Sequence, residues 1–131
     1  MSIGIEARVS GSMDGVIDQV TEALKTEGFG ILTRIDVDKT LKTKIDVDFR
    51  PYVILGACNP KLAHQALSAR PDVGMLLPCN VVVEQEDDAI LVRAIDPGAM
   101  MGFADFGSDA TLTRLGAEAR EKISRAIASL A

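Results

Sequence analysis

The segment that decides the fold is residues 80–95, which have the sequence NVVVEQEDDAILVRAI. Two apolar runs, residues 80–85 and 89–95, flank the acidic turn Glu86-Asp87-Asp88. Runs rich in Val and Ile on either side of a short polar turn are typical of a β-hairpin. Because a tight hairpin joins antiparallel strands, this segment predicts a sheet that is largely antiparallel.

Three further strands are expected on the N-terminal side of this hairpin. Residues 51–58, PYVILGAC, contain no charged side chain, which is typical of a strand buried on both faces. Pro51 is compatible with such a strand only at its start or on an edge. Residues 3–9 and 29–37 alternate apolar with other residues and indicate two half-buried strands.

Three helices are expected near residues 12–27, 60–69 and 109–130, where apolar residues recur at helical spacing. Each begins after a side chain that can cap its first turn: Ser12, Asn59, and Ser108 or Asp109. Residues 39–44 are expected to form one helical turn, and residues 99–107 to be irregular. The order β-α-β-β-α-β-β-α predicts a single α+β domain over residues 1–131. We expect a two-layer sandwich of about five strands with helices on one face.

The composition and the charge of the chain argue against nucleic-acid-binding and membrane proteins. The chain of 131 residues is 47% hydrophobic and 25% charged, and its 14 basic and 19 acidic side chains give a net charge of −5. Nucleic-acid binding depends on phosphate neutralisation, so this acidic balance argues against it. The N-terminus has no basic signal-peptide start, and no apolar run approaches the ~18–20 residues that span a bilayer. We therefore expect no membrane partner and a cytoplasmic location.

The candidate site is built around two Cys-Asn pairs. Cys58 closes one expected strand and Cys79 opens the next, and they are followed by Asn59 and Asn80. His64, the only histidine, lies in the expected helix between them. If the two strands are near neighbours, both sulfur atoms approach one rim of the sheet. These five residues are the candidate ligand-binding residues.

Several interpretations of the cysteines stay open. They are small buried apolar residues, which is the commonest role of a free cysteine. Alternatively, Cys58, Cys79 and His64, with Met100 or Met101, form a soft-ligand site for copper, zinc or a haem iron. A closed structural zinc site is disfavoured because Cys and His supply only three ligands. In a third interpretation Cys58 is the candidate catalytic residue, a thiolate stabilised by the helix start and by His64. In the last interpretation Cys58 and Cys79 form a redox disulfide.

Five segments of the chain carry a resemblance to a known family: residues 28–33, 48–52, 55–60, 76–81 and 94–97. Together they resemble the signature of the domain of unknown function 302 (DUF302) family over essentially the whole chain. The resemblance implies a TATA-box-binding-protein-like α+β fold, with a curved antiparallel sheet backed by helices, often as a homodimer. The family has no established activity, so the resemblance assigns no catalytic residue.

The leading functional hypothesis is a non-enzymatic domain that binds a soft metal or small ligand at the Cys58/Cys79/His64 rim. The alternatives are a thiol-dependent enzyme or redox protein that uses Cys58, and a dimeric interaction module without a ligand. A homodimer is expected because Phe49, Tyr52 and residues 100–103 place large apolar groups in or beside turns.

Overall fold

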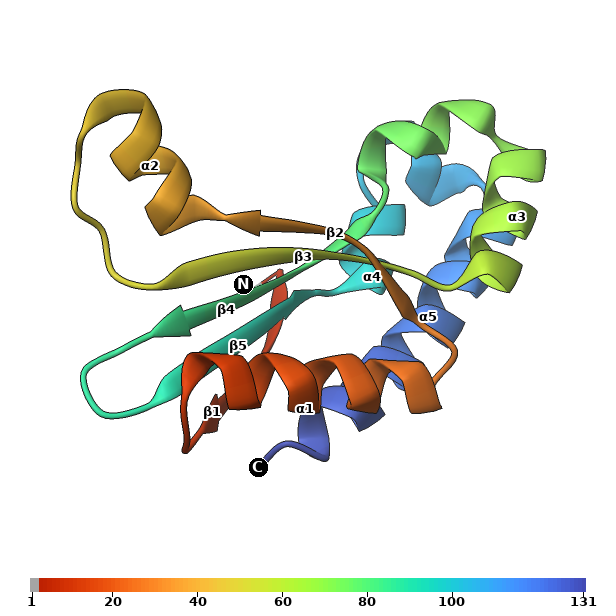
Figure 1. The fold of residues 1–131 in the computed structure, drawn as a ribbon. Coiled ribbons are helices and arrows are strands. Elements are labelled where there is room, and N and C mark those ends of the chain that lie inside the picture. The colour runs from red at the N-terminus through yellow and green to blue at the C-terminus, as the bar shows by residue number, and fades with distance from the viewer. Residues whose placement is uncertain (1–2) are drawn as a thin grey trace.

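The structure is a computed structural model that describes residues 3–131. Within these residues it contains one five-stranded sheet in the order β1-β5-β4-β3-β2 (Figure 1). Every pair of neighbouring strands is antiparallel, so the α+β class predicted from the sequence is confirmed. The strands are β1 (Gly4–Val9), β2 (Gly30–Asp36), β3 (Tyr52–Cys58), β4 (Cys79–Gln85) and β5 (Ile90–Ile95).

The three helices expected from the sequence are all present. They are α1 (Met13–Thr26), α3 (Pro60–Ala69) and α5 (Ala110–Ala128). The side chains of Ser12, Asn59 and Asp109 each accept a hydrogen bond from the backbone N–H three residues later, at 3.1, 3.2 and 3.0 Å. These bonds satisfy donors that an uncapped first turn would leave without a partner. Asp109, rather than Ser108, is therefore the residue that caps α5.

Two segments differ from the expectation. Residues 37–45 form the helix α2 (Val37–Ile45), which is longer than the single turn expected there. Residues 97–108 are not irregular, since they form α4 (Pro97–Met101) and the 3₁₀ helix η2 (Ala104–Ser108). A second 3₁₀ helix, η1 (Pro71–Leu76), links α3 to β4 and buries Val73 completely.

The core lies between the sheet and the long helices. Helix α1 packs on β2 and β4, and α5 packs on β1 and β5. The strand residues that face these helices are almost fully buried, including Leu55, Val81 and Val92. No helix within residues 3–131 is long and apolar enough to cross a membrane.

Helices α4 and α5 approach each other closely at Gly116. A Cβ atom at this position would lie 2.9 Å from Cβ of Met101 and 3.0 Å from the carbonyl oxygen of Pro97. Glycine is a poor helix former, so its presence inside α5 is explained by this contact. Met101 is buried at this contact, with 6% of its surface exposed.

The substitution Gly116→Ala is therefore expected to destabilise the protein, although alanine favours the helix by about 1 kcal/mol. The added methyl group overpacks the α4–α5 contact, at a cost of roughly 1–3 kcal/mol. We expect the free energy of unfolding in urea to fall. At the exposed neighbouring position of α5, Ala117→Gly should cost about 1 kcal/mol through propensity alone. A Gly116→Ala protein more stable than the parent would contradict this account.

Candidate functional site

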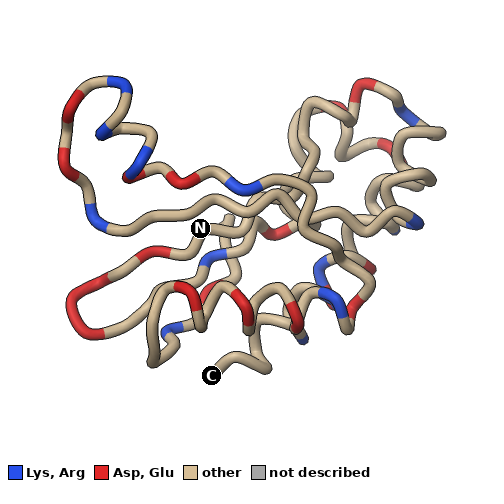
Figure 2. Tube along the Cα trace, in the orientation of Figure 1, with Lys and Arg blue, Asp and Glu red and all other residues tan. Residues whose placement is uncertain are grey.

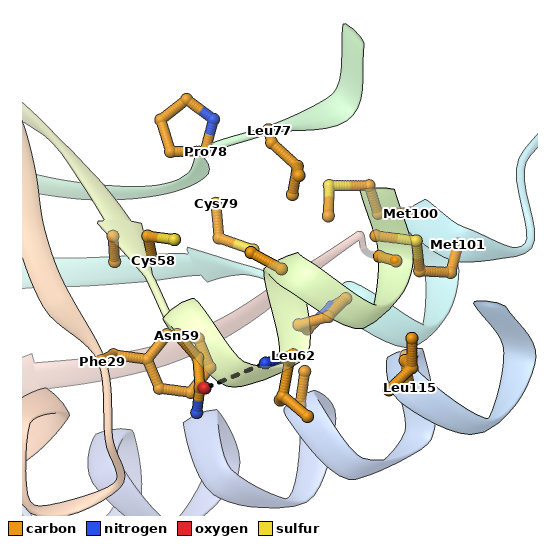
Figure 3. Close-up of a pocket in the computed structure, with 16 residues that line it drawn as sticks. Phe29, Cys58, Asn59, Leu62, Leu77, Pro78, Cys79, Met100, Met101 and Leu115 are labelled. Carbon is orange, nitrogen blue, oxygen red and sulfur yellow. Dashed lines mark hydrogen bonds between the residues drawn. The ribbon is translucent and has the colours of Figure 1, made fainter. Parts of the chain in front are cut away.

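An apolar pocket lies where the end of β3 and the start of β4 meet α3, α4 and α5 (Figure 3). Its cavity volume is only about 40 Å³, which is room for an ion or one or two water molecules. Its walls are mainly aliphatic and aromatic, and include Phe29, Leu62, Leu77, Pro78, Leu115 and Ala119. A mostly apolar recess with a few chemically distinct groups is the usual form of a small-ligand site.

The distinct groups in this pocket are sulfur atoms. Cys58 from β3, Cys79 from β4, and Met100 and Met101 from α4 all line it (Figure 3). The β3–β4 register pairs Ala57 with Cys79, so Cys58 is one residue beyond that pair on the adjacent strand. Cys79 and Met101 are both 6% exposed, whereas Cys58 and Met100 are partly exposed. The pocket therefore has two sulfur atoms in its wall and two nearer its mouth.

Asn59 also lines the pocket, but its polar atoms already have partners. Its Oδ1 accepts the hydrogen bond from Leu62 N–H that caps α3. Its Nδ2 donates to the carbonyl oxygen of Glu27 at 3.5 Å, at the end of α1. Asn59 therefore joins two helices beside the pocket, and its side chain is fixed by this structural role.

His64 and Asn80 do not join the two cysteines. His64 is exposed on α3 and does not line the pocket. Asn80 pairs with Gly56 across the sheet and is exposed on the face opposite to Cys79. In the described part of the chain no group of three or more His, Cys, Asp or Glu is placed to hold a metal ion. The ligand set Cys58, Cys79 and His64 is therefore not assembled, because α3 turns His64 toward solvent.

Comparison with known proteins places the chain in one family. The family model described as a domain of unknown function, DUF302, matches residues 5–130. The chain belongs to the DUF302 family. It is also similar to the crystal structure of an uncharacterized conserved DUF302 protein from Bacillus stearothermophilus, with a TM-score of 0.89 and 30% identity over 100% of both chains. A search of curated proteins found no match. Neither family description assigns an activity, so the functional argument depends on the pocket.

The two thiols of this DUF302 protein differ in their surroundings. Burial, together with a smaller contribution from the nearby Cys58, raises the pKa of Cys79 to about 11. The residues that line the pocket, within the described chain, include no charged side chain and no histidine. A thiolate nucleophile is normally stabilised by such a neighbour. Of the two features expected to stabilise a Cys58 thiolate, the start of α3 is present at Pro60, whereas His64 does not line the pocket. Both cysteines are free.

Sequence reasoning did not find the buried charge on the other face of the sheet. Glu84 is only 2% exposed and accepts a hydrogen bond from Arg50 Nε at 2.8 Å. The guanidinium group of Arg93 binds the same carboxylate. Two arginines offset the cost of burying one carboxylate, which would otherwise be large. The sequence contains one sign of this buried charge, which is that Glu84 is the single acidic residue at the end of the apolar run that begins at Val81.

The thiols should react at very different rates with iodoacetamide at pH 8. With a pKa of about 11, only about one Cys79 in a thousand is ionised at this pH, and its sulfur is also buried. We expect intact-mass measurements to show one rapid alkylation, mapped to Cys58 by peptide analysis. Cys79 should react only after unfolding. The Cys58→Ala variant is the control and should stay unmodified while folded, and equal rates at both thiols would contradict the assignment.

Proposed function

We propose that this DUF302 protein is a non-enzymatic binding domain that holds a soft metal ion, copper(I), in the sulfur-lined pocket. The observation that supports this proposal is that two thiols and two thioethers from β3, β4 and α4 line one apolar pocket. Thiolate and thioether ligands select copper(I), whereas carbonyl and carboxylate oxygens select magnesium and calcium. The described lining residues offer no carboxylate.

The ligand atoms that the pocket offers also favour copper(I) over zinc and haem. Zinc takes four thiolate, imidazole or carboxylate ligands in structural sites, and the pocket supplies only Cys58 and Cys79 of these types. Copper(I) also accepts thioethers, so Met100 and Met101 can complete its coordination. A cavity of about 40 Å³ is far too small for the macrocycle of a haem.

Charge balance favours this ion in a dry pocket. The groups of the pocket that can become negatively charged are the thiols of Cys58 and Cys79. Because its pKa is raised, Cys79 carries its proton at neutral pH. When copper(I) replaces one thiol proton, an S–H bond breaks, an S–Cu bond forms and the proton leaves to solvent. The pocket then gains one positive and one negative charge, and its net charge is unchanged. Binding should therefore weaken about tenfold for each unit that the pH falls, for each proton displaced.

A cytoplasmic setting is part of the proposal, because a reducing compartment keeps both thiols free. The proposal includes no nucleic-acid or membrane partner, and the net charge of −5 supports the first of these exclusions.

The proposal is tested by anaerobic titration of untagged protein with copper(I) against a competing colorimetric chelator. One copper per chain is expected. Cys58→Ser and Cys79→Ser should each weaken binding by roughly 100-fold, because a metal ligand contributes about 3 kcal/mol. Met100→Leu, which keeps shape but removes a donor, should also weaken binding. Met75→Leu is the matched control, since Met75 is 78% exposed and lies outside the pocket.

Circular dichroism of each variant separates loss of binding from loss of fold. Copper affinity that is unchanged in folded Cys79→Ser would overturn the site. The same conclusion would follow if Met75→Leu and Met100→Leu lost affinity equally, since the methionine effect would then be nonspecific.

A further inference from the structure

The sulfur-lined pocket has room for a metal ion but not for the molecule that delivers it, because its volume is about 40 Å³. Copper(I) prefers soft thiolate and thioether ligands, so it reaches a protein bound to such a ligand and is passed on by ligand exchange. The donor must therefore stay outside the pocket and bring its sulfur atom to an accessible thiol. That thiol is Cys58, which is partly exposed, whereas Cys79 is only 6% exposed.

A second, open cleft adjoins the pocket where α1 ends and α3 begins. It is lined by Thr26, Glu27, Gly28, Asn59, Pro60, Lys61 and Lys122. Asn59 lines both the pocket and the cleft, and Cys58 is the residue directly before it. The cleft has a volume of about 450 Å³, which is the size of a site for a small molecule. A molecule bound in the cleft therefore lies beside the accessible thiol of the pocket.

The cleft is positively charged, although the chain as a whole has a net charge of −5. Lys61 is exposed and Lys122 is partly exposed, and neither forms an ion pair within residues 3–131. Glu27 is the only acidic residue among the described residues of the lining. Its carboxylate is already bound by Nη2 of Arg125 at 2.8 Å and by Nε at 3.1 Å. The ammonium groups of the two lysines are therefore left to attract an anion.

We propose that this cleft binds the carboxylate groups of a small anionic thiol that delivers copper(I) to Cys58, an inference that rests on the proposed function. The bound donor passes on the ion by ligand exchange. The bond between copper and the donor sulfur breaks, a bond between copper and Cys58 Sγ forms, and the proton of Cys58 passes to the departing thiolate. Copper stays in the +1 state, so no oxidant or reductant is needed. Lys61 and Lys122 hold the donor and do not bind the metal.

Anaerobic stopped-flow measurements of copper(I) transfer test the proposal. One donor is the copper(I) complex of glutathione, a thiol with carboxylate groups, and the reference donor is the complex of mercaptoethanol, an uncharged thiol. Lys61→Gln/Lys122→Gln should slow transfer from glutathione roughly tenfold, because the attraction between the lysines and the carboxylates is lost. Transfer from mercaptoethanol should keep the parent's rate. A variant that takes copper(I) from glutathione as fast as the parent does would overturn the proposal.

The matched control is Lys39→Gln/Lys44→Gln. It removes the same charge from two exposed lysines of α2, which lies at the opposite end of the molecule from α3 (Figure 2). Both donors should transfer copper(I) to this variant at the parent's rate. An equal loss of rate in the two double variants would show that net charge, and not the cleft, controls transfer. Added salt should slow transfer from glutathione more in the parent than in Lys61→Gln/Lys122→Gln, because it screens the attraction.

A second measurement separates the cleft from copper binding. S-methylglutathione keeps the carboxylate groups but has no free thiol, so it cannot deliver copper(I). In amide NMR spectra of the metal-free protein it should shift the signals of Thr26 and Gly28 in the parent and not in Lys61→Gln/Lys122→Gln. Absence of these shifts in the parent would overturn the assignment of the cleft even if copper(I) binds. Shifts in a protein that takes up no copper(I) would refute the copper site and support the anion site.

Discussion

The antiparallel pairing of β3 with β4 is the constraint on which the pocket depends. Ala57 is opposite Cys79, so the chain must leave the sheet after Cys58 and return to the same rim at Cys79. The segment between them contains α3 and η1, and the buried residues Leu62 and Ala66 of α3 form part of the pocket wall. A shift of one residue in this register would turn Cys79 to the other face of the sheet and separate it from the pocket. Glycine is required at position 56 in this strand, because a Cβ there would collide with the side chains of Thr33 and Pro78.

The methionines reach the same pocket through a different constraint, the packing of one helix on another. Asp96 caps α4 through a 2.8 Å hydrogen bond from Gly98 N–H and is paired with Arg120 of α5 at 3.1 Å. With Gly116 allowing the backbones to approach, α4 is held between α5 and the sheet. Strand register therefore positions the thiols, and helix packing positions the thioethers. A displacement of either the strands or α4 would therefore separate the thiols from the thioethers and weaken the binding of a ligand that needs both.

Local patterns predicted the strands, the long helices and their caps, because each is encoded within a few neighbouring residues. They also predicted the strand ends that carry Cys58 and Cys79. They did not predict α4, which is a short helix stabilised by its contact with α5. The spacing in the sequence puts His64 on the flank of the apolar stripe of α3, nearest Leu67, from which it could reach the rim of the sheet or face solvent. In the structure Leu67 is 40% exposed, so that flank of the helix faces solvent and His64 with it. The orientation of a helix about its own axis depends on how it packs against its neighbours, so residue spacing alone does not predict it.

Helix α2 and the segments on either side of it, residues 32–50, are anchored to the sheet by polar contacts, although no residue of the helix is fully buried. Arg50 binds the buried carboxylate of Glu84 and stacks over the ring of Phe49 at 4.7 Å. Asp38 at the start of α2 accepts a hydrogen bond from Tyr52 N–H at 3.3 Å. An exposed apolar segment on a loose loop would lose conformational entropy on binding, whereas one anchored to the sheet has already lost most of it. Glu84 thus connects the segment after α2 to the sheet, because its buried carboxylate binds Arg50 from that segment and Arg93 of β5.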